Sequence, residues 1–281
     1  MKSCDLHTHS VFSDGTFTPE ELIKEAQNKG LSSIALTDHN NIGGIERFKA
    51  EAKKTDVEAV AGIEFSTDYG DTELHILGLF LKEEYFPQVN ERAKELIERK
   101  DESNRILVER LNGAGYEIDY DSIKKSTMGT VNRAHIGEIL YKKGYVSSIK
   151  ESFTTLLSKN SPYYHTPKRL DVFETIDFIR SIGSIPILAH PFLDLDAPKL
   201  RIFLEKAVKF GLVGMETVYS TYDSGTTLLC KKIAKEFNLK ESGGSDFHGE
   251  RKPYISLGIG KGNLFIPYEF CENLRPKKIC I

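Results

Sequence analysis

The chain of 281 residues is long enough to bury a full core and to form one barrel-sized domain, alone or with a large insertion. Its formal net charge of −3 argues against a generally basic protein that binds nucleic acid non-specifically, although it allows a local basic pocket. The four cysteines, Cys4, Cys230, Cys271 and Cys280, include no C-x-x-C pair, which argues against a zinc ribbon and a redox motif. No run approaches the ~18 to 20 apolar residues of a membrane span, and no signal-like segment is present, so we expect a soluble cytoplasmic protein.

Residues 1–82 alternate short apolar strands with helices. Thr18 is a predicted helix cap, because Pro19 occupies the first helical position and Glu21 follows three residues after the cap. Leu22, Ile23 and Ala26 form the apolar stripe of this helix. The next predicted elements are a strand over 31–36, a helix over 45–54 and strands over 57–63 and 74–81. Such alternation predicts parallel strands with active groups at their carboxyl ends.

A helical stretch then interrupts this alternation of strands and helices. Helices are predicted over 85–111, 119–125, 133–143 and 148–158, and strand signals are nearly absent up to Ile185. We therefore predict a helical insertion over 83–168, whose charge runs are solvated helix faces.

Alternation resumes in residues 169–281. Helices are predicted over 170–182, 197–210 and 226–237, and strands over 185–189, 212–218 and 241–245. The sequence thus predicts an α/β fold built from residues 1–82 and 169–281, with the insertion between them.

Six of the eight histidines lie at boundaries of predicted strands, and carboxylates lie beside most of them. His7 and His9 point to the same side only if their segment is extended, because side chains two apart share a face of a strand. Such a pair alone is equally typical of two solvent-facing histidines on an edge strand. The recurrence of histidine and carboxylate at further strand ends favours a metal site.

Together these motifs resemble the polymerase and histidinol phosphatase (PHP) family of metal-dependent phosphoesterases over most of the chain. The residues that carry the resemblance are Asp5-Leu-His7-Thr-His9-Ser10, Ser13-Asp14-Gly15, Thr37-Asp38-His39, Gly62-Ile63-Glu64, His75, Ala189-His190-Pro191 and Ser245-Asp246-Phe247-His248. The resemblance implies a distorted (β/α)7 barrel with three metal ions at its carboxyl-end face. It implies that His7, His9, Glu64 and Asp246 hold the first ion, that Glu64, His75 and His190 hold the second, and that Asp14, His39 and His248 hold the third. Some family members carry histidine at the position of Asp14.

The chemistry of these residues agrees with the resemblance. Imidazole and carboxylate ligands suit Mn2+, our first expectation, and also Zn2+ or Fe2+. Clustered divalent ions lower the pKa of a water and neutralise charge at phosphorus, so no Ser or Cys nucleophile is required. We expect two or three ions and assign catalytic roles to Asp5, Asp38 and Glu64. Asp5 is expected to orient ligands, whereas Asp38 either orients ligands, acts as a general acid or is a turn residue.

Substrate choice is predicted to lie in the insertion. The pattern resembles a PHP subgroup in which the insertion binds a nucleotide, and it implies that Arg133, His135, Tyr164 and Lys168 contact the substrate. Arg133 is suited to binding a phosphate through two parallel hydrogen bonds. Lys168 is suited to supplying a point charge and Tyr164 to stacking on a base. An ordinary structural role for each remains open.

The subgroup removes the 3′-phosphate of nucleoside 3′,5′-bisphosphates and trims short 5′-phosphorylated RNA. We therefore expect a small phosphorylated substrate, a nucleotide or short oligonucleotide, and no membrane or stable protein partner. Two alternatives stay open: a histidinol-phosphate phosphatase or other small phosphomonoesterase, and a non-catalytic metal-binding module.

Overall fold

The structure, a computed structural model, describes residues 2–128, 131–262 and 264–276. The strands within these residues are β1 (Cys4–Asp5), β2 (Ser33–Leu36), β3 (Glu58–Tyr69), β4 (Thr72–Leu79), β5 (Leu170–Asp171), β6 (Ile185–Leu188), β7 (Gly214–Tyr219) and β8 (Lys240–Gly244). They form one sheet in the order β1-β2-β3-β4-β6-β7-β8, with β5 paired to β3.

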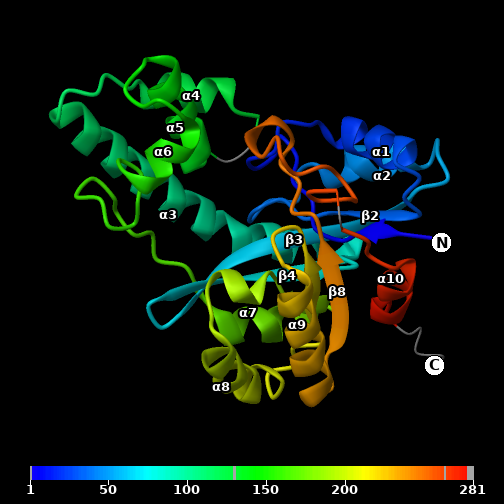
Figure 1. Ribbon diagram of the computed structural model, residues 1–281. Coiled ribbons are helices and arrows are strands. Elements are labelled where there is room, and N and C mark those ends of the chain that lie inside the picture. The colour runs from blue at the N-terminus through cyan, green and yellow to red at the C-terminus, as the bar shows by residue number, and fades with distance from the viewer. Residues whose placement is uncertain (1, 129–130, 263, 277–281) are drawn as a thin grey trace.

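Contacts between the end strands curl this sheet into a nearly closed barrel. The amide of Leu6, just after β1, donates to the carbonyl of Gly243 in β8 at 3.1 Å, and Thr8 forms a parallel bridge with Phe247. The helices packed on the sheet are α1 (Pro19–Asn28), α2 (Ile45–Ala52), α7 (Val172–Ser181), α8 (Ala197–Ala207), α9 (Ser224–Glu236) and α10 (Tyr268–Leu274) (Figure 1). The expected distorted (β/α)7 barrel is confirmed.

The prediction that the strands pair in parallel is wrong for one strand. β4 runs antiparallel to both β3 and β6, because Gly70 and Asp71 alone connect β3 to β4 and so short a loop reverses the chain. An antiparallel strand begins at the edge where its parallel neighbours end. His75, near the start of β4, therefore lies beside the carboxyl ends of the other strands.

The helical insertion is present and has an apolar core of its own. It contains α3 (Phe86–Gly113), α4 (Tyr120–Ser126), α5 (Arg133–Lys142) and α6 (Ile149–Thr154). The first half of α3 packs on the barrel through Val89, Ala93 and Leu96. Its second half joins α4 and α5 in a separate cluster, to which Leu111 and Ile136 belong, and these helices project from the barrel (Figure 1). The domain boundaries at 82/83 and 168/169 stay a prediction.

Several element boundaries differ from the predicted ones. α6 ends at Thr154 rather than near residue 158, and the segment expected to begin as a helix at residue 170 begins as the short strand β5. α10, which was not predicted, packs against β8 and β1. The described cysteines are free and buried, and Cys280 lies outside the described residues. Among the described residues, no helix is both long and apolar enough to cross a bilayer.

The predicted start of α1 is confirmed in detail. The Thr18 hydroxyl accepts from the Glu21 amide, and the Glu21 carboxylate accepts from the Thr18 amide at 2.8 Å. The predicted stripe of Leu22, Ile23 and Ala26 is buried.

Replacing Thr18 by alanine is expected to lower the free energy of unfolding by about 0.5 to 2 kcal/mol, because an amide of the first turn loses its acceptor. Urea denaturation measures this. Thr221→Ala is the control, since Thr221 is exposed and makes no side-chain hydrogen bond within the described residues. Equal midpoints for the two variants would show that the cap contributes nothing.

Candidate metal centre

The nine side chains predicted to bind metal converge at one face of the barrel. His7 and His9 follow β1, His39 follows β2, His190 follows β6, and Asp246 and His248 follow β8. Within the described residues the nine form four overlapping groups whose nitrogen and oxygen atoms lie within 4.8 Å of one another. These groups are His7–His9–Asp246, His7–Glu64–His190, His39–Glu64–His75 and His9–Asp14–His39–His248.

The group expected to hold the first ion is compact. His7 Nε2 and His9 Nε2 lie 3.1 Å apart, and each lies 3.2 Å from Glu64 Oε2. Asp246 Oδ1 lies 3.2 Å from His9 Nε2 and 3.7 Å from His7 Nε2. All four residues are buried, so their donor atoms face one another rather than solvent.

Glu64 also belongs to the group expected to hold the second ion. Its other oxygen, Oε1, lies 2.7 Å from His75 Nδ1 and 3.2 Å from His190 Nε2. Each oxygen of one carboxylate therefore faces a different set of imidazoles. This arrangement suits a carboxylate that bridges two ions.

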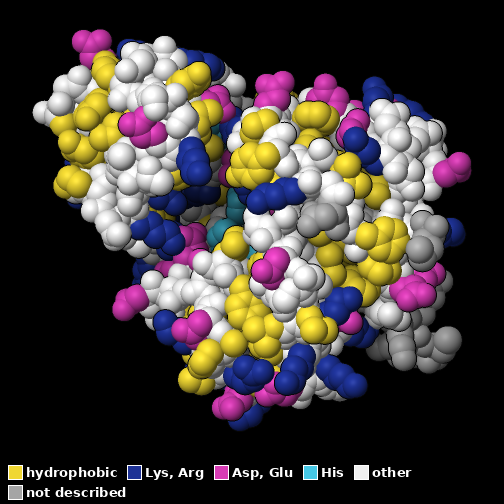
Figure 2. Space-filling model, viewed as in Figure 1, with side chains coloured by type: hydrophobic (Ala, Val, Ile, Leu, Met, Phe, Trp, Pro, Cys, Tyr) yellow, Lys and Arg dark blue, Asp and Glu magenta, His cyan; other side chains and the backbone are white. Residues whose placement is uncertain are grey.

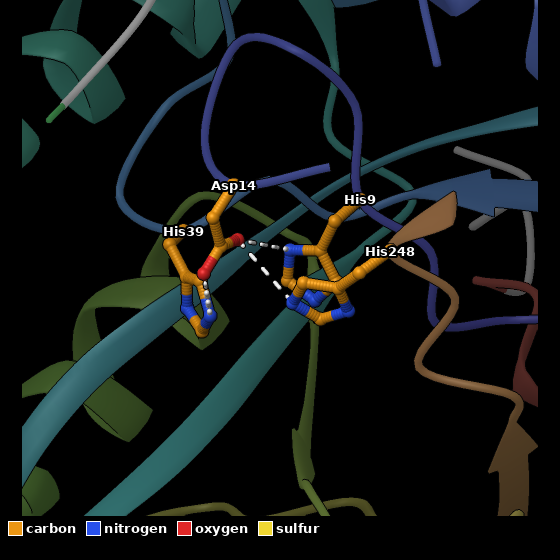
Figure 3. Close-up of side chains that lie close together, drawn as sticks. All are labelled: His9, Asp14, His39 and His248. Carbon is orange, nitrogen blue, oxygen red and sulfur yellow. Dashed lines mark ion pairs between the residues drawn. The ribbon is translucent and has the colours of Figure 1, made fainter. Parts of the chain in front are cut away.

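Asp14 lies at the centre of the group expected to hold the third ion. Its carboxylate oxygens lie 3.3 Å from His248 Nε2, 3.7 Å from His9 Nδ1 and 3.8 Å from His39 Nε2 (Figure 3). His9 thus faces the first group with Nε2 and Asp14 with Nδ1.

Buried nitrogen and oxygen atoms that lack a hydrogen-bond partner fit a site for divalent metal ions. Glu64 Oε2 and His39 Nδ1 lie 3.0 Å apart, yet neither atom makes a hydrogen bond of acceptable geometry within the described residues. Ligand atoms around an ion at ~2.0 to 2.2 Å stand roughly 3.0 to 3.5 Å apart, which matches the separations around Glu64. Imidazoles and carboxylates without thiols suit Mn2+, Zn2+ or Fe2+.

The electrostatics keep the carboxylates of this cluster charged. Burial alone raises the pKa of Glu64, but His39, His7 and His75 together hold that pKa well below its usual range. Burial alone would also raise the pKa of Asp14, but His39 and His248 hold that pKa well below its usual range. Ionised carboxylates are the form that binds metal.

Asp5 and Asp38 stabilise the loops that carry the ligands. Asp5 accepts from the amide and hydroxyl of Ser245, next to Asp246, and from the Gly258 amide. Asp38 accepts from the Ser10 amide and from the hydroxyls of Ser10 and Ser13, in the loop between His9 and Asp14. Because both oxygens of Asp38 are buried and bonded to this loop, the geometry favours a positioning role for Asp38 over general acid catalysis.

A cavity of about 320 Å³ connects this centre to the insertion. Its walls include Asp14, His39, His75 and His190 from the barrel and Arg133, Tyr164 and Lys168 from the predicted substrate-binding residues. Figure 2 shows the cleft between the two lobes, with histidine at its floor and basic side chains around it.

His135 differs from the other predicted substrate residues. It is not among the side chains that line the cavity, and its Nδ1 accepts from the Asn132 amide at 2.9 Å at the start of α5. Burial, reinforced by Arg251, lowers the pKa of His135 to about 4, so its imidazole is neutral at pH 7. This geometry favours a helix-capping role for His135.

The cavity also includes residues that the sequence did not single out. Lys100 lines it from α3, and among the described residues it has no ion pair within 4 Å. Phe153 lines it from α6 and is exposed. A lysine in a long charged helix and an aromatic in a short one give no sequence signal, because only the fold turns them towards the barrel.

Comparison with known proteins identifies the family. The model of the PHP domain matches residues 5–166, which is more than half of the chain. The chain belongs to the PHP family. The match covers eight motif residues of the metal centre, from Asp5 to His75, and much of the insertion. As a member of this family, the protein is a metal-dependent phosphoric ester hydrolase.

Its relatives carry several phosphoesterase names. The chain is 30% identical over 248 residues to a 5′-3′ exoribonuclease of Haemophilus influenzae, covering 88% of this chain and 90% of the relative. It is 29% identical over 264 residues to a phosphoribosyl 1,2-cyclic phosphate 1,2-diphosphodiesterase of Eggerthella lenta, covering 91% and 98%. It is 26% identical over 251 residues to a 3′,5′-nucleoside bisphosphate phosphatase of Chromobacterium violaceum, covering 88% of both.

A solved structure from Bifidobacterium adolescentis shares the fold. It superposes on this PHP chain with a TM-score of 0.86 at 23% identity, covering 97% of this chain and 95% of the other. The likeness extends over both the barrel and the insertion.

Proposed function

We propose that this PHP chain removes the 3′-phosphate of nucleoside 3′,5′-bisphosphates and cleaves short 5′-phosphorylated RNA by the same chemistry. The observation that carries the proposal is the cavity that joins the histidine and carboxylate cluster to Arg133 and Lys168. A substrate with a phosphate at each end needs both features. The names of the Haemophilus and Chromobacterium relatives support this substrate class.

The insertion would anchor the 5′-phosphate away from the metal centre. The Arg133 guanidinium stacks 4.8 Å from the ring centre of Tyr164 and donates to the Leu157 carbonyl at 2.8 Å, which fixes its direction. Its remaining donors and the exposed amine of Lys168 are available for a phosphate. Phe153 and Tyr164 both line the cavity and offer aromatic surfaces for a base.

The metal centre would receive the 3′-phosphoester. His7, His9, Glu64 and Asp246 would hold one ion, Glu64, His75 and His190 a second, and Asp14, His39 and His248 a third, with Mn2+ as our first choice. Bound ions lower the pKa of a water, which supplies hydroxide at neutral pH, and neutralise the phosphoryl oxygens. Asp5 and Asp38 keep the ligand loops in place, and Lys100 faces the path between the two phosphates.

Turnover of a substrate panel with Mn2+ tests the proposal. We expect adenosine 3′,5′-bisphosphate to yield adenosine 5′-monophosphate and phosphate, and 5′-phosphorylated RNA to be cut faster than the same RNA with a 5′-hydroxyl. Histidinol phosphate and a cyclic phosphodiester complete the panel. Preference for either of these two would reject the proposed substrate class.

Replacing Arg133 by alanine is expected to lower kcat/KM for adenosine 3′,5′-bisphosphate by roughly 10- to 150-fold, the equivalent of a charge-assisted contact of ~1.5 to 3 kcal/mol. An aryl phosphate without a second phosphate should be nearly unaffected. Arg133→Lys should recover only part of the loss, because an ammonium lacks the two-pronged geometry.

The control for this variant is Arg105→Ala. Arg105 also lies in the insertion, but it pairs with Asp121 and is not part of the cavity wall. Thermal melts of both variants show whether the insertion stays folded. Equal losses on both substrates for Arg133→Ala would remove Arg133 from the binding site.

A further inference from the structure

Glu216 is a buried carboxylate beneath the metal centre to which no role has yet been given. It lies in β7, its side chain is inaccessible to solvent, and it is not one of the nine predicted ligands. Among the described residues its only ionic neighbour within 4 Å is His7, so neither Lys nor Arg balances its charge. A buried carboxylate without such a partner is costly, and it is retained only where other groups compensate it.

Each carboxylate oxygen of Glu216 accepts a hydrogen bond from a different residue predicted to bind metal. His7 Nδ1 donates to Oε1 at 3.1 Å, and the backbone amide of His190 donates to Oε2 at 2.7 Å. The first bond places a proton on Nδ1 of His7 and leaves Nε2 as a lone pair facing His9 and Glu64. His7 belongs to the group of the first ion and His190 to that of the second.

The second bond supports a strained backbone. His190 has φ +28° and ψ 55°, in the left-handed region that non-glycine residues rarely adopt. This conformation turns the chain after β6 and directs His190 Nε2 to Glu64 Oε1, 3.2 Å away. The rings of His7 and His190 consequently stack with their centres 5.6 Å apart.

The neighbouring strand is shaped to accommodate Glu216. Gly244 at the end of β8 has no side chain, and a Cβ there would lie 2.9 Å from Glu216 Oε1 and 2.1 Å from His7 Cβ. The register of β7 against β8 also shifts between Glu216 and Val218. Sheet irregularities of this kind redirect a side chain.

We propose that Glu216 is a positioning residue that fixes His7 and His190 together, so that the first and second ions bind as a pair. The inference rests on the metal centre of the proposed function and goes beyond it, because it makes occupancy of two ions depend on a residue that ligates neither. None of the three residues of the third group contacts Glu216. They are Asp14, His39 and His248.

Glu216→Gln tests the proposal by separating the two bonds. An amide has one acceptor oxygen, whereas the site presents two donors, so the glutamine side chain of the variant cannot satisfy both His7 Nδ1–H and the His190 amide. We expect affinity for the first and second ions to fall together by roughly 10- to 100-fold, as for lost carboxylate–imidazole contacts elsewhere. A Mn2+ titration followed by elemental analysis should show both ions of the pair binding to the variant only at a roughly 10- to 100-fold higher free Mn2+ concentration than to the wild type. The spin resonance signal of the coupled Mn2+ pair should shift to the same higher concentration.

Glu241→Gln is the matched control. Glu241 lies on the adjacent strand β8 and accepts from the Thr217 hydroxyl at 2.8 Å, away from the ligands. It should retain every ion and the coupled signal. Weaker binding of one ion only in Glu216→Gln, or of none, would overturn the proposal.

A folding control and a second variant distinguish loss of ion binding from loss of the fold. Circular dichroism of the metal-free proteins shows whether Glu216→Gln is folded. If it is not, Glu216→Asp keeps the charge but is too short to reach both donors, and it should bind the same two ions more weakly while the folded metal-free state persists. A wild type that binds no ions would instead reject the metal centre itself, and the proposed function with it.

Discussion

Glu64→Gln is expected to abolish most phosphoesterase activity and to cause the largest loss of any single substitution in the centre. Its Oε2 faces His7, His9 and His39, and its Oε1 faces His75 and His190. Removing this charge disturbs the ligand sets of two ions at once. The fall in kcat/KM should therefore exceed the ~10- to 100-fold typical of a lost outer contact, which is the loss expected for Asp5→Asn.

Glu58→Gln is the control for this comparison. Glu58 lies six residues earlier in the same strand, where it pairs with Arg275 and Tyr268 instead of the imidazoles. Steady-state kinetics of the three variants on adenosine 3′,5′-bisphosphate, with a melt of each, give the ranking. An equal or larger loss for Asp5→Asn would reject the bridging role of Glu64.

Removal of metal is expected to abolish turnover and to lower the melting temperature. Protein purified without chelator, or reconstituted with Mn2+, should hold two to three ions per chain. An ion present at 100 times its Kd stabilises a protein by about 2.7 kcal/mol, which corresponds to roughly 4 to 5 °C per ion for a chain of this size. The effect is large because Glu64 and Asp246 are buried carboxylates whose charges bound ions would neutralise.

Elemental analysis and melting curves before and after chelation measure these effects. Restoration by Mn2+ is the control for damage by the chelator. Fewer than one ion per chain after both preparations would remove the metal cluster from the account.

The sequence singled out the nine side chains that converge in the structure, because histidine and carboxylate recur together at strand ends. Motifs such as His7-Thr-His9 and Asp246-Phe-His248 lie at different strand ends, and the barrel brings strand ends together. Their grouping in space needed the structure. His75 illustrates this point, because it reaches Glu64 only through the antiparallel β4.

The antiparallel turn itself had a signal in the sequence. Gly70-Asp71 between two apolar runs is typical of a two-residue hairpin, but the surrounding helix and strand alternation favoured parallel pairing. Glu216 carried a weaker signal, a single carboxylate within the apolar run of β7. Lys100 carried none, since its position on the cavity depends on how α3 crosses from the barrel to the insertion.

Anomalous diffraction from crystals soaked in Mn2+ tests the central claim most directly. We predict one peak among His7, His9, Glu64 and Asp246, and a second among Glu64, His75 and His190. A third is predicted among Asp14, His39 and His248. The absence of density within these three groups, in crystals of protein that hydrolyses adenosine 3′,5′-bisphosphate, would contradict the account.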